Sequence, residues 1–412
     1  MKNFKLSLGI LIISSLFSCS SNTVVSNELS NEQNVEISSS INKNFDSNGI
    51  SKKYVLVKLK NSTSKFDIFS TKYQTKIKKV IPKINVMVVE IPETKTSQNF
   101  LQTLKNDKDV LFAEADTKVD LDDFNDPMIN DQYSLKKVDA FSAWNINQGN
   151  SDTVIAIIDT GVDLDHPDLK EKMLEGYNVI APGTPPKDDV RHGTHVAGIA
   201  AAIGNNAIGV SGLAPKCKIL PVKVLGNGTG SMETVSEGLI WAVDHGADVV
   251  NMSLGTYTEN KTLGESVKYA LGKNVVCVAT MGNDNVERRR YPAGFAGMIA
   301  ISSTDENDKK SSFSNYGNWI TVSAPGTNIL STLPTYMSPN GYGKMSGTSM
   351  AAPLVTGLVG LMRSQRKGLS PAEASKILKE TADDLGDTGF DNYFGSGRVN
   401  AGKALSLLKK GK

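Results

Sequence analysis

Three residue types that together can perform nucleophilic hydrolysis stand at suggestive positions in this 412-residue chain. Asp159 ends the apolar run TVIAIID, His192 opens RHGTHVAGIAAAIG, and Ser349 lies within GKMSGTSMAAPLVTG. A serine hydroxyl becomes a nucleophile when a histidine takes its proton and a carboxylate orients the imidazole. The small residues around Ser349 have two explanations: close helix packing, or the approach of a substrate to the hydroxyl.

Elimination among the four histidines favours His192 as the base. His166 lies in the turn-like DHPDL, and His245 follows an amphipathic helical stretch as a C-terminal cap. His192 and His195 could bind zinc, but the metalloprotease motif places its histidines at i and i+4 around a glutamate, and no third ligand is evident. We expect Gly193 to leave one face of the His192 imidazole open.

An aspartic dyad is a further alternative, because DTG occurs at Asp159 and again at Asp387. Such a dyad needs two equivalent carboxylates that share a proton. The second DTG follows the polar KETADDLG, without an apolar strand to present it. The α/β alternation of the chain also argues against an all-β aspartic protease.

The segments between these residues predict the fold that positions them. Apolar strand-like runs alternate with helical stretches such as residues 231–246, which indicates a mostly parallel sheet with helices on both faces. In such sheets the chemistry gathers at the carboxyl ends of the strands, where Asp159 and Asn283 both stand. The predicted strands lie within residues 153–159, 218–225, 247–255, 274–283 and 297–304.

The order Asp, His, Ser differs from that of an α/β-hydrolase, which runs Ser, Asp, His and carries G-x-S-x-G. AIIDTGVDLDHPDL, HGTHVAG, NNAIGVSGLAP, NMSLG, Gly282-Asn283 and SGTSMAAP follow one another here. These blocks resemble the successive signature blocks of the subtilisin-like serine proteases, the subtilases, and cover residues 126–412. The resemblance implies a subtilisin-like α/β catalytic domain.

The resemblance also implies roles for individual residues. Ser349 would be the nucleophile, His192 the general base, and Asp159 the group that orients the imidazole. Asn283 and the backbone N–H of Ser349 would form the oxyanion hole, and the small residues around Ser349 would admit the peptide. Ser253, Leu254 and Gly255 would line the cleft as an edge for extended substrate.

Arg290 falls where subtilases place the floor of their main specificity pocket, a site that is often small or neutral. Pointing inward, its guanidinium would favour Asp or Glu immediately before the cut. Pointing to solvent, or paired with Glu287, it would leave an ordinary pocket. Arg191, before the base, and Leu354, after AAP, are two smaller departures from the family pattern.

A structural calcium ion is implied by the same resemblance, through the loop GNNAIGV and two distant acidic residues. All-oxygen ligation by six or seven groups suits calcium. We expect Asp163 and Asp165 to face solvent instead. The implied ligands are Asp126, Asp168, Gly204, Asn206, Ile208 and Val210.

The N-terminal third is expected to contain no catalytic group. Residues 1–18 are typical of a secretory signal, and Cys19 at its end resembles the acylated cysteine of bacterial lipoproteins, with a plain signal peptide as the alternative. Residues 19–52 predict a disordered tether. Residues 53–122 predict a small α+β unit, similar in layout to the inhibitory propeptides of the family, whose ten lysines between Lys52 and Lys83 we expect to be solvated.

The expected protein is therefore an exported serine endopeptidase made as a zymogen, anchored at the cell envelope through Cys19 or extracellular after processing. Cleavage of its prodomain is expected near Asp122, where VDLDDFNDP is rich in the acidic residues that a pocket with an arginine floor would select; a merely acidic linker is the alternative.

Formal net charge is only +2, so composition does not indicate nucleic acid. Cys217 and Cys277 are expected to be buried free thiols rather than a disulfide. A catalytically idle subtilase-like binding module is the competing hypothesis.

Overall fold

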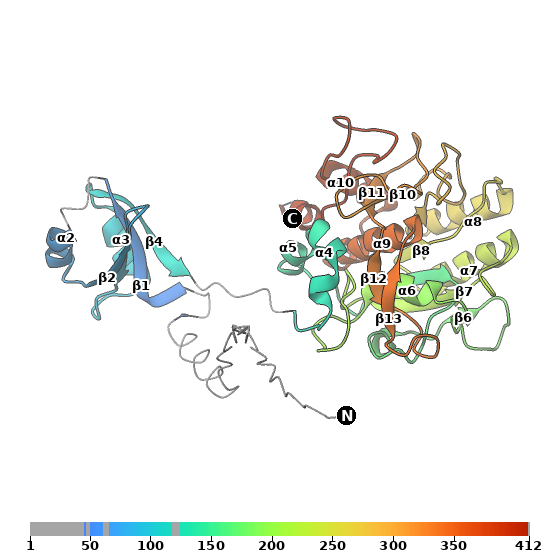
Figure 1. Ribbon diagram of the computed structural model, residues 1–412, viewed down its shortest axis with the longest axis horizontal. Helices are drawn as coiled ribbons and strands as arrows, with labels where there is room; N and C mark the ends of the chain where they lie inside the picture. The colour runs from blue at the N-terminus through green and yellow to red at the C-terminus, as the bar shows by residue number, and fades with distance from the viewer. Residues whose placement is uncertain (1–44, 47–49, 61–65, 118–123, 411–412) are drawn as a thin grey trace, which may run out of the picture. The chain divides into compact units, whose positions relative to one another are not determined.

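The computed structural model describes residues 45–46, 50–60, 66–117 and 124–410, which belong to two compact units divided between Leu121 and Asp122 (Figure 1). The predicted signal peptide, Cys19, most of the tether and the expected cleavage segment around Asp122 lie outside the described residues. Within the described ranges, no helix combines the length and the apolar character needed to cross a bilayer.

The N-terminal unit is a four-stranded antiparallel sheet with two helices, as the predicted α+β layout requires. Its strand order is β2-β3-β1-β4. Inward side chains such as Val55 and Met87 pack against Phe100 and Leu104 of the second helix to form a small separate core. The elements are β1 (Ile50–Leu59), α2 (Phe66–Tyr73), β2 (Ile77–Ile81), β3 (Val86–Glu90), α3 (Ser97–Lys105) and β4 (Val110–Thr117).

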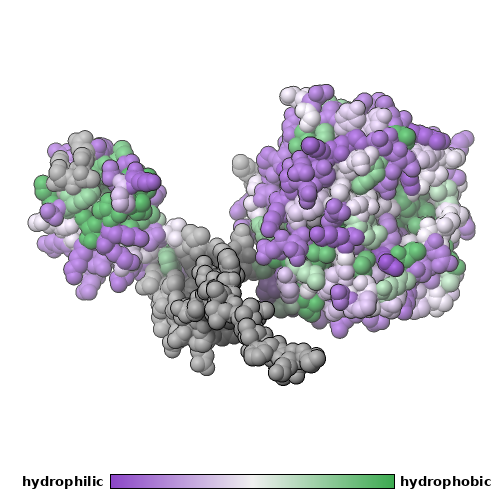
Figure 2. Space-filling view, viewed as in Figure 1, coloured by the Kyte–Doolittle hydropathy of each residue, from purple (hydrophilic) through white to green (hydrophobic). Residues whose placement is uncertain are grey.

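The surface of this small unit carries several exposed large hydrophobic side chains. Ile68, Ile84 and Leu111 are each more than half exposed. Figure 2 shows a hydrophobic area on the visible face of the unit.

The second unit is built on seven parallel strands in the order β11-β10-β9-β8-β5-β7-β6. The chain leaves β5 toward one edge of the sheet and later returns to add β8 on its other side, so β5 is central. This reversal places the carboxyl end of β5 at a topological switch point, where α/β proteins bind ligands. The strands are β5 (Val154–Asp159), β6 (Tyr177–Asn178), β7 (Lys218–Lys223), β8 (Val249–Met252), β9 (Val276–Thr280), β10 (Ile299–Thr304) and β11 (Val322–Pro325).

Helices cover both faces of this sheet, which explains why its strands are apolar throughout rather than alternating (Figure 1). Ile155 and Ile157 of β5 belong to the core beneath α6 (His192–Ala201) and α9 (Thr348–Gln365). Ala156 and Ile158 belong to the core beneath α7 (Met232–Asp244) and α8 (Lys261–Gly272).

Free Cys217 and Cys277 lie in these two different cores. The expectation of buried free thiols is therefore confirmed. Burial raises the pKa of the Cys217 thiol to about 11 and that of Cys277 to about 12.

The helix N-termini differ in how their first N–H groups are satisfied. The helices α7, α8 and α10 (Pro371–Thr381) have their own side-chain caps, from Ser231, Asn260 and Ser370 respectively. The helices α6 and α9 have none, because their N-cap residues Arg191 and Gly347 make no side-chain cap bond. Their N–H groups are met by side chains from other segments, which ties both helices to the site described below.

The remaining elements complete the packing around α6 and α9. The hairpin of β12 (Ile329–Thr332) and β13 (Tyr342–Met345) is bonded to α6, since the hydroxyls of Ser331 and Thr332 donate to the carbonyls of His195 and Thr194. The other helices are η2 (Ile129–Asp131), α4 (Tyr133–Lys137), α5 (Ala140–Trp144), η3 (Lys170–Lys172) and α11 (Ala401–Lys410).

Candidate active site

Asp159 and His192, which lie far apart in the sequence, are joined by a short hydrogen bond. Asp159 is the last residue of β5 and fully buried, while His192 is the first residue of α6 and a quarter of its side chain is exposed. The distance from His192 Nδ1 to Asp159 Oδ1 is 2.7 Å. Because Asp159 can only accept, Nδ1 carries the proton, and Nε2 is left as the nitrogen that can receive one.

Opposing effects act on the pKa of His192. Burial disfavours the charged imidazolium, but the charge and hydrogen bond of Asp159 and the charge of Asp188 outweigh it, so the pKa of His192 is raised. A raised pKa means that this imidazole holds a transferred proton more strongly than an ordinary histidine does.

A network that the sequence did not predict holds this pair in place. Buried Asp188 accepts hydrogen bonds from the hydroxyl of Thr160 at 2.8 Å and from the N–H and hydroxyl of Thr194 at 2.9 and 2.7 Å. The Thr160 hydroxyl in turn accepts from the N–H of Gly193 at 2.9 Å. Asp188 therefore replaces the missing cap of α6 and fixes the helix against the end of β5.

Gly193 has a packing role that the sequence did not predict. A Cβ at this position would lie 2.1 Å from the carbonyl oxygen of Gly161 and 3.2 Å from Cβ of Asp159. Glycine is thus needed so that α6 can approach β5 closely, and the open face of the imidazole stays a prediction.

Ser349 is the second residue of α9 and is bonded to the cleft through Ser253. Its hydroxyl donates to the Ser253 carbonyl at 3.2 Å, and the Ser253 hydroxyl donates to the Ser349 carbonyl at 2.9 Å. In the described part of the chain, no hydrogen bond joins Ser349 to His192. Ser253 and His192 line the same pocket, so the residue that accepts from the Ser349 hydroxyl borders the same space as the imidazole.

Most of the small residues around Ser349 serve helix packing. Ala351 and Ala352 are fully buried in the core. A Cβ on Gly357 would lie 2.7 Å from the carbonyl oxygen of Ala200 in α6. The close crossing of α6 and α9 therefore explains these residues, and the expectation that they admit the substrate is wrong for them.

Asn283 follows β9 and lies beside the N-terminus of α9. Its Oδ1 accepts hydrogen bonds from both the N–H and the hydroxyl of Thr348, each at 2.8 Å. These two donors fix which end of the carboxamide is the oxygen. The NH₂ group is left without an acceptor among the described residues and can donate to a ligand.

A pocket of about 480 Å³ opens beside His192. The expected substrate segment Ser253, Leu254 and Gly255 forms one wall, together with Arg290. The opposite side is formed by the chain after β7 and the start of α7, including Leu225, Gly230, Met232 and Val235.

Arg290 lies in this pocket, which bears on the alternatives left open by the sequence. One Nη donates to the Gly255 carbonyl at 2.7 Å, and the other is 3.8 Å from a carboxylate oxygen of Asp284. No ion pair with Glu287 is formed within the described residues. The Arg290 side chain is 23% exposed, so it is partly buried in the pocket and still accessible to solvent.

The other candidate bases and dyads do not form sites. His166 is buried, accepts from the N–H of Asp168 through Nδ1, and contacts the Gly341 carbonyl through Nε2. Nε2 of buried His195 contacts the Gly343 carbonyl at 3.1 Å, and burial lowers the pKa of His195 to about 4. Among the described residues no third ligand accompanies His192 and His195. His245 caps α7, as predicted. Asp387 is exposed beyond α10, away from any strand end.

The expected calcium ligands converge on one loop. The carboxylate of Asp126 accepts from the N–H groups of Asn205 and Asn206, and that of Asp168 accepts from the N–H of Val210 and the Asn206 side chain. Both carboxylates are buried without a cationic partner among the described residues, and burial raises the pKa of each.

Several features of this loop fit a bound calcium ion. No described donor contacts the carbonyls of Gly204, Ile208 or Val210, which remain available as ligands. Among the described residues, no cluster of three or more His, Cys, Asp or Glu side chains suited to a metal is present. Two carboxylates with several carbonyls is an oxygen-rich set that suits calcium rather than zinc.

The two further acidic residues near this loop differ from each other. Asp165 is exposed, as expected. Asp163 is 2% exposed and accepts from both the N–H and the hydroxyl of Thr335 at 2.8 Å, so its expected exposure is wrong. It anchors the β12–β13 connection instead.

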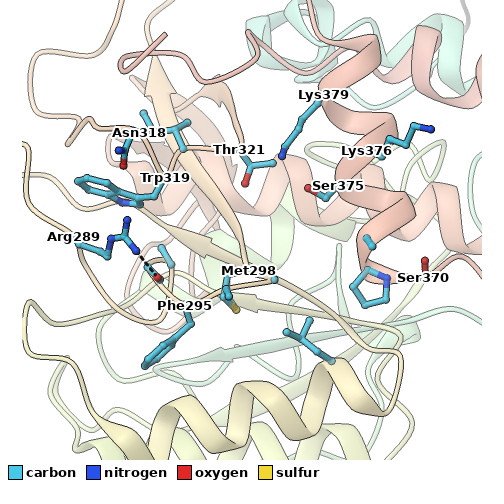
Figure 3. Close-up of a pocket in the computed structure, with 18 of the residues that line it drawn as sticks. Arg289, Phe295, Met298, Asn318, Trp319, Thr321, Ser370, Ser375, Lys376 and Lys379 are labelled. Atoms are coloured by element: carbon cyan, nitrogen blue, oxygen red, sulfur yellow. Dashed lines mark hydrogen bonds between the residues drawn. The ribbon is translucent and has the colours of Figure 1, made fainter. Parts of the chain in front are cut away.

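A further cavity, of about 1140 Å³, is separate from these residues. It lies between α10 and the chain around Arg289 and Trp319, and none of Asp159, His192, Asn283 and Ser349 lines it (Figure 3). Arg289 stacks over Trp319 there, whereas its neighbour Arg290 lines the pocket beside His192.

The fold is a parallel sheet covered by helices on both faces, with a hydrogen-bonded Asp159–His192 pair at the end of its strand β5, and comparison with known proteins gives the family. Residues 150–397 match the model of the subtilase family, and the chain belongs to that family. It is 45% identical over 283 residues to thermitase of Thermoactinomyces vulgaris, covering 68% of this chain and 98% of that one. Subtilisin Savinase of Lederbergia lenta is 40% identical over 271 residues, covering 65% and 96%. The protein is a subtilisin-like serine endopeptidase.

Similarity also covers the N-terminal unit. Residues 52–116 match the fervidolysin N-terminal prodomain. The solved structure of fervidolysin from Fervidobacterium pennivorans, described as a keratinolytic enzyme, covers 88% of this chain and 62% of its own, with a TM-score of 0.63 at 28% identity. A protease of Pseudoalteromonas arctica gives a TM-score of 0.64 at 31% identity, covering 69% and 99%.

Proposed function

We propose that Ser349, His192 and Asp159 are the catalytic triad of this endopeptidase, and that Asn283 is the side-chain donor of its oxyanion hole. The observation that carries the proposal is the 2.7 Å bond from His192 to buried Asp159, beside a pocket lined by Ser253, whose carbonyl accepts from the Ser349 hydroxyl at 3.2 Å. With its proton on Nδ1, His192 has Nε2 free to act as the general base.

The reaction follows from these positions. Ser349 Oγ attacks the scissile carbonyl while its proton passes to Nε2 of His192, and Asp159 stabilises the resulting imidazolium. The NH₂ of Asn283 and the N–H of Ser349 donate to the oxyanion, at the positive end of the α9 dipole. The imidazolium then protonates the leaving amine, and water hydrolyses the acyl-enzyme by the same route.

One adjustment is required before attack. The Ser349 hydroxyl donates to the Ser253 carbonyl and must rotate to donate to His192. Rotation about χ1 of Ser349 exchanges one neutral hydrogen bond for another. Hydrogen bonds between catalytic groups often reach their short geometry only when substrate is bound.

A serine-directed phosphonate tests the triad against the idle-module alternative. We expect covalent labelling of Ser349, loss of labelling in Ser349→Ala, and strongly reduced labelling in His192→Ala. An unlabelled Ser349 in the correctly folded protein would establish the idle module.

We further propose a preference for Asp or Glu immediately before the scissile bond, supported by the position of Arg290 in the pocket. Its guanidinium has one Nη on a carbonyl and only a long contact to Asp284, so it can bind a substrate carboxylate. In Arg290→Gly the preference should disappear while peptides with a neutral residue at that position are still cut. A preference that survives this substitution would refute the role of Arg290.

The N-terminal unit is proposed to be an intramolecular inhibitor removed by cleavage near Asp122, bounded as residues 53–122 ahead of a catalytic domain of residues 126–412. Its similarity to the fervidolysin prodomain and its exposed apolar side chains support this role. Intact mass should show loss of the N-terminal unit from wild type on incubation, whereas Ser349→Ala stays full length.

Structural calcium and export complete the proposal. Asp126, Asp168, Asn206 and the carbonyls of Gly204, Ile208 and Val210 would hold the ion, supported by the two buried carboxylates without a cation. The signal-like residues 1–18 support export, and acylation of Cys19 would anchor the precursor to a membrane. Metabolic labelling with a fatty-acid analogue, compared between wild type and Cys19→Ser, tests the anchor.

A further inference from the structure

A second cavity is lined by Arg191, the residue before the proposed catalytic histidine, and is distinct from the pocket that contains Arg290. It has a volume of about 590 Å³ and an apolar floor of Leu333, Met337 and Met345. Arg191 and Lys344 stand at its edge. Val190 lines both this cavity and the pocket that contains Arg290, so the two are contiguous along the cleft.

The chain's own geometry indicates which part of a substrate this cavity receives. Under the proposed function, on which this inference rests, Arg290 and the segment from Ser253 bind residues before the scissile bond. His192 protonates the leaving amine, so the residues after the bond must pass next to its imidazole. The cavity contains Arg191, the neighbour of His192, and none of the residues that bind the other side.

We infer that this cavity is a subsite for the first or second residue after the scissile bond and that it selects Glu or Asp there. Arg191 and Lys344 are both exposed, and neither forms an ion pair within the described ranges. The third charged lining residue, Asp189, is already paired with buried Lys223 at 2.9 Å. Among the described residues, Arg191 and Lys344 therefore line the cavity without an ion-pair partner of their own, together with three apolar side chains and Asp189, whose second carboxylate oxygen has no partner.

The substrate side chain that fits has an apolar stem and an anionic end. The methylenes of glutamate can lie on Met337 and Met345 while its carboxylate reaches the guanidinium of Arg191, which binds carboxylates in two-point geometry. A lysine in the same place would face like charges at short range.

The backbone at Arg191 supports a selected role for its side chain. Its φ of 78° lies in the left-handed region, which glycine adopts freely and arginine does not. Asp188 holds this conformation by accepting the N–H groups of Val190 and Arg191 at 3.0 and 3.1 Å. The guanidinium therefore projects from a fixed point beside His192 rather than from a free loop.

The test uses quenched peptides that share one sequence before the cut and carry Glu, Gln or Lys at the first or second position after it. In mature wild-type enzyme, kcat/KM for Glu should exceed that for Gln by about 3- to 10-fold at one of these positions, with Lys poorest, and the ratio should fall in high salt. Arg191→Gly, which suits the backbone, and Lys344→Gln should each lower the ratio, and the double variant should bring it to about 1.

Two controls separate the possible outcomes. Lys376→Gln, on exposed α10, should leave the Glu/Gln ratio unchanged, and Arg290→Gly should alter only the preference before the bond. A wild-type ratio near 1 at both positions, or a ratio that persists in the double variant, overturns the inference while the proposed function stands. Failure to cut any peptide would overturn the proposed function, and this inference with it.

Discussion

The carboxamide of Asn283 is oriented by Thr348, the residue directly before the proposed nucleophile. Both the N–H and the hydroxyl of Thr348 donate to Asn283 Oδ1, and the N–H of Gly282 also donates to the Thr348 hydroxyl at 3.2 Å. One threonine thus joins the two segments that are proposed to supply the oxyanion donors. Its two bonds occupy Oδ1 of Asn283 and leave the NH₂ without an acceptor among the described residues.

Removing either partner should lower turnover by different amounts. Asn283→Ala should reduce kcat about 10²- to 10³-fold with little change in KM, the size found when one oxyanion donor is removed in subtilisin. Thr348→Val should give a smaller loss, because the amide remains but loses one orienting bond, and Thr348→Ser should restore most of it. Steady-state kinetics on one peptide checks this order. Equal activity in Thr348→Val and wild type would show that the threonine does not orient the amide.

The acid limb of the pH–rate profile should report His192. The base must be neutral, so kcat/KM should rise as pH passes through its raised pKa. Asp188 contributes to that raised pKa, and Asp188→Asn removes a negative charge, which favours the neutral imidazole. The acid limb should therefore move to lower pH, by about half a unit or less. Asp165→Asn, at an exposed position, should leave it in place; a limb that moves upward in Asp188→Asn contradicts the assignment.

The sequence predicted the elements better than the contacts within the site. The five apolar runs became strands because both faces of the sheet are covered, and the Asp159, His192 and Ser349 segments met because their motifs end strands or begin helices. Asp188 and Thr160 were missed, since a single Asp or Thr in a loop has no periodic pattern. Asp163 was misjudged for a related reason: only the β12–β13 connection, distant in sequence, buries it.

Calcium removal should destabilise the folded enzyme at neutral pH. Without the ion, Asp126 and Asp168 are two buried carboxylates, and burial raises the pKa of each. Because the folded protein then binds protons more readily than the unfolded chain, the free energy of unfolding increases as pH falls. A chelator should therefore lower Tm strongly at pH 8 and less at pH 5. Asp168→Asn should weaken the calcium dependence of Tm, whereas Asp165→Asn should not. An unchanged Tm in chelator for a mature, inhibited enzyme would remove the structural role of the loop.

Buried Lys172 should make stability depend on pH in the alkaline range. Lys172 is 7% exposed and its Nζ donates to the Pro215 carbonyl at 2.8 Å, yet burial lowers its pKa to about 7. In the unfolded chain Lys172 keeps the ordinary pKa near 10.5, so between about pH 7 and 10 the unfolded chain binds more protons than the folded protein does. The free energy of unfolding therefore rises with pH in this range, by about 1.4 kcal/mol per pH unit. Lys172→Met lacks this contribution. The unfolding free energy of Lys172→Met minus that of wild type should thus be largest near pH 7 and should fall toward pH 10. Denaturant titrations of the inhibited enzyme in saturating calcium would measure this difference. A difference that stays constant across this range would mean that the ammonium keeps its proton inside the fold.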